Sequence, residues 1–456
     1  MTRWNTPLPH KHANPTLLNV LAHSILAGEA SVVAITGRMY KTLGREWRWI
    51  QPMAQRYVEQ FALGTRPRLH KVVEFLAKDK GLRGAQARSG NTLQIRDRFA
   101  VQQQMLPAPK AGHWKVPVIE SKGELATWLG LSASELEWFA DLKRLLARSN
   151  EQKIQHYFYR VLAKDSGSAR LIEAPKPRLK KVQRKILTDI VERIPPHPAA
   201  HGFVIGRSIK TFAAPHAGRR VVLRMDLREF FPSLRSGRVQ ALFRTAGYPE
   251  RVADLLGGLC TNAVPRGLWN CSTTAVDPLA LHEMRQRYSW PHLPQGAPTS
   301  PALANLCAHR LDRRLNGLAR AAGAIYTRYA DDLAFSGDGG FEKHVERFAA
   351  HVAAIVLEEG FEVHHRKTRI MRQGVRQYLA GVVTNEHVNV VRADFDRLKA
   401  TLTNCVVHGP ESQNREQHPA FRQHLCGRVA FAEMLNPQKG ARLRKIFARI
   451  QWAGEE

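Results

Sequence analysis

The sequence predicts an α+β fold, with short strands in the middle of the chain and helices on both sides of them. Apolar residues recur three and four positions apart between about residues 15 and 150, as in LHKVVEFLAK. Short apolar runs next to turn residues follow, for example RRVVLRMD and AIYTRYADDLAFSG. After Val391 the helical spacing returns. Strands grouped between helical regions are typical of the α+β class.

The charge of the chain favours a polyanionic partner. Its 456 residues, enough for two or three domains, include 69 lysines and arginines against 39 aspartates and glutamates, a formal net charge of +30. Such a field attracts nucleic acid first and an anionic membrane second. No run approaches the roughly 18 apolar residues of a spanning helix, and the N-terminal stretch is polar. We therefore expect a cytoplasmic protein that binds nucleic acid and has no membrane partner.

The cysteines argue against a disulfide framework and against a zinc site. Their number is odd, and no CxxC pair occurs. We interpret all five as reduced, buried thiols: Cys260, Cys271, Cys307, Cys405 and Cys426.

The first third of the chain is predicted to be mostly helical. QRYVEQFALG and LHKVVEFLAK have the spacing of two amphipathic helices. The stretch QQQMLPAPKAGHWKVPVIES contains turn residues and predicts a linker. LGLSASELEWFADLKRLL predicts a further helix with Ser132 or Ser134 near its N-cap.

The strands are predicted to begin near Tyr157. HYFYRVLAKDSGSARLIEAPKP indicates two short strands around a turn at Asp165–Ser168. RLKKVQRKILTDIVERI predicts a basic amphipathic helix, RRVVLRMDLREFFPSL a strand running into a helix, and AIYTRYADDLAFSG a strand, a tight turn and a strand. Apolar residues at helical spacing predict the later helices: Phe395, Leu398, Leu402, Phe421, Leu425 and Val429.

Three aspartates stand at the ends of predicted strands, and each has a simple alternative interpretation. Asp226 follows the apolar run 221–225, and with Glu229 three residues later it would suit a capping box. Asp331 and Asp332 lie side by side between two apolar runs, where aspartate also favours a solvated hairpin turn.

Together the three aspartates predict a magnesium site. Carboxylates at the ends of sheet strands can converge on one point, where they repel one another unless a divalent cation neutralises them. Two Mg²⁺ ions suit the in-line attack of a 3′-hydroxyl on a nucleoside triphosphate, because one activates the attacking oxygen and the other stabilises the leaving pyrophosphate. A basic surface and this chemistry both indicate nucleic-acid synthesis.

Four ordered blocks, HGFVIGRSI, DLREFF, LPQGAPTSPALANL and RYADD, resemble the reverse transcriptases. More narrowly, the chain between about Leu125 and Trp452 resembles the retron-type, or msDNA, reverse transcriptases of bacteria. The resemblance implies a right-hand polymerase fold of fingers, a palm with an antiparallel sheet, and a helical thumb. The implied boundaries are 1–125 for a helical N-terminal extension, 126–219 for the fingers, 220–385 for the palm with part of the fingers, and 386–456 for an RNA-binding thumb.

The resemblance also implies roles for individual residues. Asp226, Asp331 and Asp332 match the catalytic, metal-binding carboxylates of the family, with Asp331 a principal ligand and Asp332 a supporting one. Phe231 matches an aromatic residue that lies under the sugar and favours deoxynucleotides, although the pair Phe230–Phe231 would also suit the core. We expect one ring of that pair on each side, because neighbouring side chains cannot share a direction.

Further matches concern the nucleotide pocket. Gln295 and Gly296 match residues that line it, and for Ser300–Pro301 we expect an N-cap and a first helical turn. Two basic residues are expected near the triphosphate. Arg170 has a guanidinium that suits phosphate. Lys367 would assist the pyrophosphate, with a plain surface role as its alternative.

Other basic residues are expected to contact RNA through its shape and phosphates, or to form solvated helix faces. They are Lys180, Lys181, Arg184, Arg422, Arg428 and Arg442. Two retron signatures have altered counterparts. An Asn-Ala-x-x-His motif aligns with Phe212 to His216, and a Val-Thr-Gly motif aligns with Leu379 to Gly381.

The sequence therefore predicts an RNA-directed DNA polymerase that copies part of a cognate structured noncoding RNA into single-stranded DNA. The resemblance implies dNTPs as substrates, priming from a 2′-hydroxyl of that RNA, an effector protein as a possible partner, and a role in anti-phage defence. One alternative is another bacterial reverse transcriptase of the group II intron, diversity-generating or abortive-infection type. The absence of a maturase-like or nuclease domain before Glu456 counts against an intron enzyme. A second alternative is a non-catalytic RNA-binding protein on a polymerase fold.

Overall fold

The computed structural model confirms the α+β class and divides the chain into two compact units. It describes residues 15–61, 67–89, 93–99, 104–149, 151–163, 169–270 and 278–452. The first unit is formed by Met1–Leu146 and Ser236–Cys260, and the second by Ala147–Arg235 and Thr261–Glu456. The four subdomain boundaries given above stay a prediction. So does the turn at 165–168, which lies outside the described residues.

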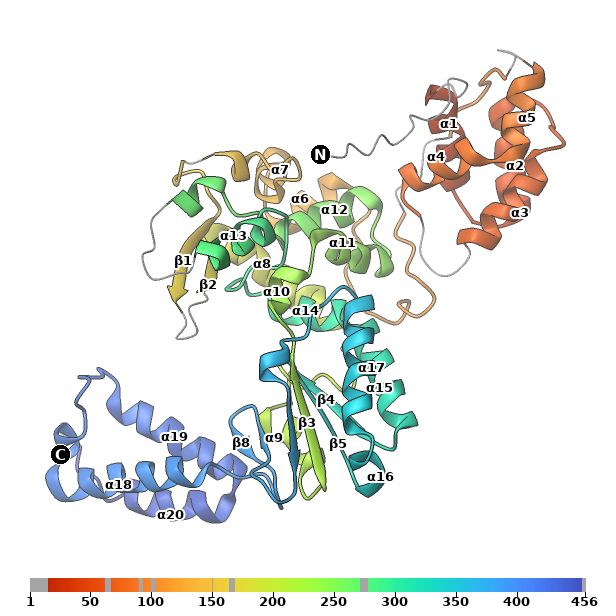
Figure 1. Ribbon diagram of the computed structural model, residues 1–456. Coiled ribbons are helices and arrows are strands. Elements are labelled where there is room, and N and C mark those ends of the chain that lie inside the picture. Colours follow the sequence, from red (N-terminus) through yellow and green to blue (C-terminus); the bar gives the residue numbers. More distant parts are fainter. Residues whose placement is uncertain are drawn as a thin grey trace. The chain divides into compact units, whose positions relative to one another are not determined.

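The first unit begins with helices that share one apolar core (Figure 1). Leu21, Ile35, Met53 and Leu76 lie in that core and are at most 1% exposed, as the helical spacing predicts. The helices are α1 (Pro15–Leu26), α2 (Val32–Leu43), α3 (Ile50–Phe61), α4 (Leu69–Lys78) and α5 (Lys80–Ser89).

The remaining helices of the first unit are α6 (Lys122–Leu129), α7 (Ala133–Ala140), α11 (Ser236–Thr245) and α12 (Glu250–Leu259). Ser132 caps α7 through a capping box with Glu135, which confirms the predicted start. The helix ends earlier than expected because Asp141 adopts a left-handed conformation, with φ of 36°. Helices α7 and α12 cross closely at Gly258, where a Cβ would lie 2.3 Å from the Ala140 carbonyl oxygen.

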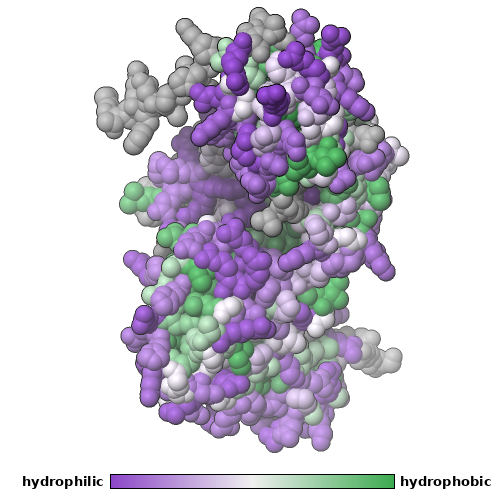
Figure 2. Space-filling view, turned by 90° about the vertical axis from the view of Figure 1, so that its right-hand side faces the viewer, coloured by the Kyte–Doolittle hydropathy of each residue, from purple (hydrophilic) through white to green (hydrophobic). Residues whose placement is uncertain are grey.

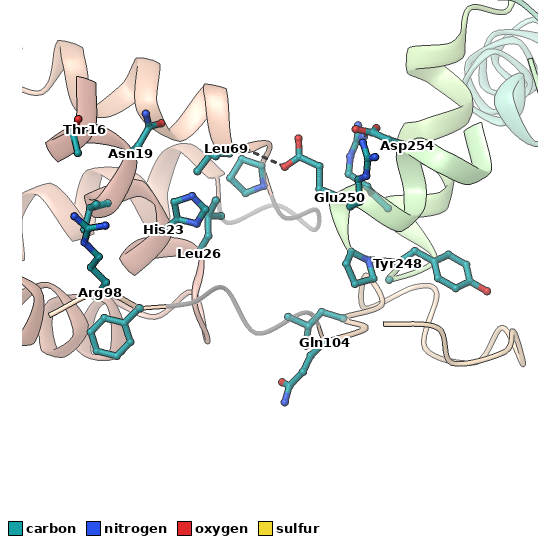
Figure 3. Close-up of a pocket in the computed structure, with 18 residues that line it drawn as sticks. Thr16, Asn19, His23, Leu26, Leu69, Arg98, Gln104, Tyr248, Glu250 and Asp254 are labelled. Carbon is teal, nitrogen blue, oxygen red and sulfur yellow. Dashed lines mark hydrogen bonds and ion pairs between the residues drawn. The ribbon is translucent and has the colours of Figure 1, made fainter. Parts of the chain in front are cut away.

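A cavity of about 940 Å³ lies within the first unit (Figure 3). Apolar, acidic and basic side chains all line it, among them Leu69, Arg98, Tyr248, Glu250 and Asp254. The Leu69 N–H donates to the Glu250 carboxylate at 3.3 Å across this space.

The second unit is built around a four-stranded antiparallel sheet with the order β4-β5-β3-β6 (Figure 1). Its strands are β3 (Val221–Asp226), β4 (Ile325–Tyr329), β5 (Asp332–Gly337) and β6 (Arg369–Arg372). The first three confirm predicted strands, whereas the sequence pattern predicts no strand at β6. Strands β4 and β5 form the predicted tight hairpin, in which Tyr329 pairs with Asp332 and two residues make the turn.

The two faces of this sheet have different coverings. On one face, Phe335 packs against Phe348 of α17 (Val345–Glu358), next to α15 (His309–Ala321). On the other face, Phe212 of α9 (Ile209–Ala213) joins Val222, Ala334 and Met371 in a second core cluster. Alternation along the strands puts Asp226 and Asp332 on this second face, which we call the aspartate face.

A second hairpin and several helices complete the region beside the sheet. Strands β1 (Tyr157–Ala163) and β2 (Ala169–Pro175) pair in antiparallel fashion and confirm the predicted strand pair. The neighbouring helices are α8 (Pro177–Asp189), α10 (Phe230–Ser233), α13 (Pro278–Tyr288), α14 (Ser300–Cys307) and α16 (Gly339–Glu342). The expectation that Ser300 caps α14 is wrong by one residue, because Thr299 holds the N-cap position and Ser300 begins the helix.

The chain then forms a small hairpin and three helices. Strands β7 (Tyr378–Leu379) and β8 (Val382–Val383) are joined by Ala380 and Gly381, both at positive φ. Helices α18 (Arg392–His408), α19 (Phe421–Leu435) and α20 (Pro437–Phe447) follow and share a core of Leu402, Val429 and other apolar residues. Helices α19 and α20 approach at Gly440, where a Cβ would lie 2.2 Å from the Glu433 Cα.

The surface is consistent with the high charge of the chain. The face drawn in Figure 2 is mostly hydrophilic, with small hydrophobic areas between the polar ones. Among the residues that the structure describes, no helix is long and apolar enough to span a membrane. The described cysteines 260, 307, 405 and 426 form no disulfide. Cys260 and Cys405 are buried as expected, but the expectation of burial is wrong for Cys307 and Cys426, which are only partly buried.

Candidate active site

The structure brings the three aspartates together at one end of the central sheet. Asp226, the last residue of β3, stands directly opposite Asp332, the first residue of β5. The Leu227 N–H donates to the Asp331 carbonyl oxygen at 2.9 Å, so the pairing continues into the turn. Asp226 does not cap a helix, because α10 begins at Phe230 and Glu229 takes its N-cap position without a side-chain cap. The capping-box alternative is therefore wrong.

Two cations from the protein balance two of these carboxylates. The Lys367 ammonium lies 3.1 Å from both Asp226 carboxylate oxygens. Arg224 donates through Nε at 2.9 Å and through Nη2 at 2.8 Å to Asp332 Oδ1. The second pair is diagonal across the strands, since Arg224 stands opposite Ala334, two residues beyond Asp332. Among the described residues, no lysine or arginine side chain is hydrogen bonded to the Asp331 carboxylate.

Asp331 has the most perturbed carboxyl group of the three. Burial, and then the charges of Asp226 and Asp332, raise its pKa from 3.8 to about 6. Burial also raises the pKa of Asp332, and the Arg224 guanidinium opposes this rise. Charging the site without a divalent ion is therefore costly for the folded protein.

We expect Asp331→Asn to stabilise the metal-free protein, and only at neutral or alkaline pH. The pKa of Asp331 is higher in the folded protein than in the unfolded chain, so the protonated Asp331 favours folding. This contribution of Asp331 to the free energy of unfolding is present below about pH 4 and is lost as the pH rises through about 6. At pH 8 the variant should gain about 1–3 kcal/mol in free energy of unfolding. Urea unfolding in chelator at pH 8 and at pH 4 measures this, and an equal difference at the two pH values would contradict it.

The residues present suit a divalent metal ion. Carboxylate oxygens are the ligands that Mg²⁺ prefers, and Asp226 already binds a cationic group, the Lys367 ammonium. Within the described ranges, no three His, Cys, Asp or Glu side chains are already grouped so as to hold a metal. Asp226 and Asp332 are instead ion-paired with Lys367 and Arg224. A metal ion that used both Asp226 oxygens would have to displace Lys367.

A fully buried ionic network fixes the turn that carries Asp331. Arg328 and Asp312 of α15 are both 0% exposed. They form a bidentate pair, with Nε to Oδ1 at 2.7 Å and Nη2 to Oδ2 at 2.6 Å. Arg328 Nη1 also donates to the Ala330 carbonyl oxygen in the turn at 3.0 Å. The network therefore connects the helix-covered face of the sheet with the turn that carries Asp331.

The network extends to a second segment beside the turn. Arg328 Nη1 donates to Asn305 Oδ1 at 3.0 Å, and Asn305 Nδ2 donates to the Gly202 carbonyl oxygen at 2.7 Å. Gly202 lies so close to the turn that a Cβ would be 2.7 Å from the Ala330 nitrogen. The predicted blocks HGFVIGRSI and RYADD are thus in direct backbone contact.

The structure places Gln295 and Gly296 against the β1–β2 hairpin. The Glu173 N–H donates to the Gln295 carbonyl oxygen at 2.7 Å, and a Cβ on Gly296 would lie 2.9 Å from the Glu173 carbonyl oxygen. Glu173 is 0% exposed and lies 2.9 Å from His292 Nε2, which joins the same loop to the hairpin. Gln295 Oε1 is buried, and no described residue is hydrogen bonded to it.

The two rings of the aromatic pair differ in burial, as expected, but they also contact each other edge to face, with centroids 5.7 Å apart. Phe230 is 3% exposed and packs on Phe361, whereas Phe231 is half-buried and has its ring centroid 6.3 Å from that of Phe203. Phe231 is thus the ring of this pair that remains accessible beside the strand end of Asp226.

The other predicted basic residues lie mainly on the surface. Arg170 is exposed on β2, and Lys180, Lys181 and Arg184 are exposed along α8. In the C-terminal helices Arg422 and Arg442 are exposed and Arg428 is half-buried. The Arg422 guanidinium lies 5.8 Å from the Trp452 ring centroid.

The altered retron signatures have clear local roles. His216 is fully buried and hydrogen bonded to Ser336 of β5 and Thr327 of β4, at 2.7 Å each. Burial, and then the charges of His201 and Arg219, lower its pKa to about 3, so the ring is neutral. Phe212 is 0% exposed in the core of the aspartate face. Gly381, with φ of 95°, suits a turn that most side chains would strain.

Comparisons with known proteins agree with this geometry. Residues 162–383 match the family described as reverse transcriptase (RNA-dependent DNA polymerase). The chain is 39% identical over 376 residues to the retron Mx65 reverse transcriptase of Myxococcus xanthus, covering 81% of each chain. It is 39% identical to the retron Mx162 reverse transcriptase of the same organism, covering 71% of this chain and 65% of the relative. It is 32% identical to the retron Ec86 reverse transcriptase of Escherichia coli, covering 62% and 77%. The chain therefore belongs to the retron-type reverse transcriptases and is an RNA-directed DNA polymerase.

Proposed function

We propose that this enzyme copies part of a cognate structured noncoding RNA into single-stranded DNA, the msDNA of a retron. The observation that carries the proposal is the match to retron reverse transcriptases over most of the chain. A right-hand arrangement of fingers, palm and thumb would place β1–β2 and α8 in the fingers, the central sheet in the palm, and α18–α20 in the thumb. We further propose that the protein acts in the bacterial cytoplasm, with an effector protein, in defence against phage.

Asp226, Asp331 and Asp332 would hold the divalent ions that reverse transcriptases use, here two Mg²⁺. When bound, such ions activate the 3′-hydroxyl for attack on a dNTP and stabilise the departing pyrophosphate. Asp331 and Asp226 are the principal ligands in this proposal. Asp332 supports them because Arg224 already takes part of its charge. Lys367, once released from Asp226, would carry its positive charge to the pyrophosphate.

The remaining residues of the pocket would position the nucleotide. Gln295 and Gly296 would line its binding surface, and the bare Gly296 backbone permits close approach. The accessible Phe231 ring would lie under the sugar and exclude a 2′-hydroxyl. Arg170, exposed on the fingers hairpin, would bind the triphosphate through paired donors.

The basic helix faces would bind the RNA. Exposed side chains on α8 and on the C-terminal helices suit recognition by shape and phosphate contacts. These side chains are Lys180, Lys181, Arg184, Arg422 and Arg442, together with the half-buried Arg428.

The test is to sequence the nucleic acid that co-purifies with the protein expressed together with its flanking genomic region. We expect one structured RNA, part of it covalently linked to DNA. Asp331→Asn should retain the RNA and lack the DNA, because RNA recognition does not need the metal site. Recovery of bulk cellular RNA alone by the wild-type protein would contradict the retron assignment of its template.

A further inference from the structure

We propose that Phe203 binds a nucleoside at the site of DNA synthesis, through an aromatic ring held rigidly beside the turn that carries Asp331. The proposal rests on the assignment of Asp331 to the active site made above. The nucleoside belongs either to the incoming dNTP or to the 3′ end of the primer, and the experiment below separates these two sources.

Phe203 has an unusual combination of exposure and backbone conformation. Its side chain is 52% exposed, although the nearby Phe212 and Phe230 are at most 3% exposed. Its φ is 58°, in the left-handed region that a residue with a bulky side chain rarely adopts. Nothing in core packing explains an aromatic residue at a strained position that leaves half of its ring in solvent.

The exposed ring lies against two side chains that belong to the proposed site. Its centroid is 6.3 Å from that of Phe231, the proposed sugar-contacting ring. It is also 6.3 Å from that of Tyr329, the residue immediately before the turn that carries Asp331, with a tilt of 38° between the planes. The three rings form one aromatic surface next to Asp331, which we call the aromatic platform.

The backbone around Phe203 is held firmly. Arg328 N–H donates to the Ala199 carbonyl oxygen, and the His201 N–H donates to the Arg328 carbonyl oxygen, both at 2.7 Å. The Gly202 carbonyl accepts from the buried Asn305 amide at 2.7 Å. These bonds add the segment to strand β4 and fix the position of residue 203 relative to the turn.

A nucleoside is the ligand that this surface suits. Every base has a flat face that stacks on an aromatic ring regardless of sequence, and a polymerase must accept all four. The platform lies beside the proposed metal ligands, where the reacting nucleotides must meet. An exposed ring that is fixed before the ligand arrives loses little conformational entropy on binding.

The experiment compares three variants on an RNA template with an annealed DNA primer. Phe203→Ala removes the ring, Phe203→Gly removes it and also relaxes the left-handed backbone, and Phe203→Tyr retains an aromatic ring. Ile205→Ala is the matched control, since Ile205 is 87% exposed on the same loop. KM for dNTP, Kd for primer–template and melting temperature are measured for each, with rates normalised to the active fraction.

We expect Phe203→Ala and Phe203→Gly to weaken one binding constant about tenfold, while Phe203→Tyr and Ile205→Ala stay near wild type. A raised KM for dNTP alone assigns the ring to the incoming nucleotide, and a raised Kd for primer–template assigns it to the primer end. Phe203→Gly should melt at a higher temperature than Phe203→Ala. If both variants nevertheless show the same binding defect, the defect comes from loss of the ring and not from loss of stability.

Unchanged constants in both ring-deletion variants would overturn the proposal. So would a normal Phe203→Gly beside a defective Phe203→Ala, because the backbone rather than the ring would then matter. The variants should keep measurable synthesis, whereas Asp331→Asn should not. Full activity in Asp331→Asn would instead refute the underlying site assignment.

Discussion

Asp331→Asn is expected to abolish DNA synthesis on an RNA template, lowering kcat by about a thousandfold or more. Its carboxylate is the one of the three that no protein cation neutralises through a hydrogen bond within the described ranges, and its pKa is raised to about 6. That carboxylate is therefore the one most in need of a metal ion. Metal stabilisation of the transition state amounts to several kcal/mol, which corresponds to a loss of this size. Primer extension with saturating dNTP measures it.

Two further variants make this result specific. Asp332→Asn should be the milder lesion, because Arg224 already shares the charge of Asp332. Asp338→Asn is the matched control. Asp338 follows the same strand, pairs with Arg219 at the surface and has a 62% exposed side chain. Synthesis by Asp331→Asn at the rate of the Asp338→Asn control would remove Asp331 from the proposed site.

Arg328→Met is expected to lower the free energy of unfolding by about 3–5 kcal/mol, because it leaves Asp312 charged and buried without its partner. The same change removes the hydrogen bond to the Ala330 carbonyl in the turn that carries Asp331. Urea unfolding of the full chain at pH 7 measures the loss. Arg313 is exposed on α15, the helix that carries Asp312, and serves as the control. Arg313→Ala should change the free energy of unfolding by less than about 0.5 kcal/mol.

The pair can be tested further by removing both charges. Arg328→Met combined with Asp312→Leu should recover part of the lost stability, since no unpaired buried charge remains. The double variant should still synthesise DNA more slowly than the wild type, because the turn and Gly202 lose their anchor. An Arg328→Met protein as stable as Arg313→Ala would show that the network does not hold the turn.

The strands and the position of the three aspartates at their ends could be predicted because their signals are local. Strands β4 and β5 lie directly on either side of Asp331, and three features of the sequence there predict them. These are alternating apolar residues, a tight turn and an apolar run. The same holds for α7, whose start at Ser132 follows from its capping box. Its early end at Asp141 has no comparable local signal, because it depends on a left-handed backbone at a non-glycine residue.

The partners of the aspartates could not be predicted, because they depend on register and tertiary packing. Lys367 reaches Asp226 from 141 positions away, and Arg224 reaches Asp332 only through the diagonal of the β3–β5 pairing. Arg328 is one arginine among many in a basic chain, and its alternating position in β4 indicates the helix-covered face of the sheet but not its partner Asp312. The exposure of Phe203 had no signal in the sequence.

Binding of Mn²⁺ as a spectroscopic substitute for Mg²⁺ tests the central claim most directly, namely that the three aspartates form a divalent metal site. Electron paramagnetic resonance counts the ions bound to the wild type, to Asp226→Asn and to Asp331→Asn in the presence of primer–template and dNTP. We expect bound Mn²⁺ with the wild type and a large loss of it with both variants, since Asp226 and Asp331 supply the principal ligands. Equal Mn²⁺ binding by all three proteins would contradict the account.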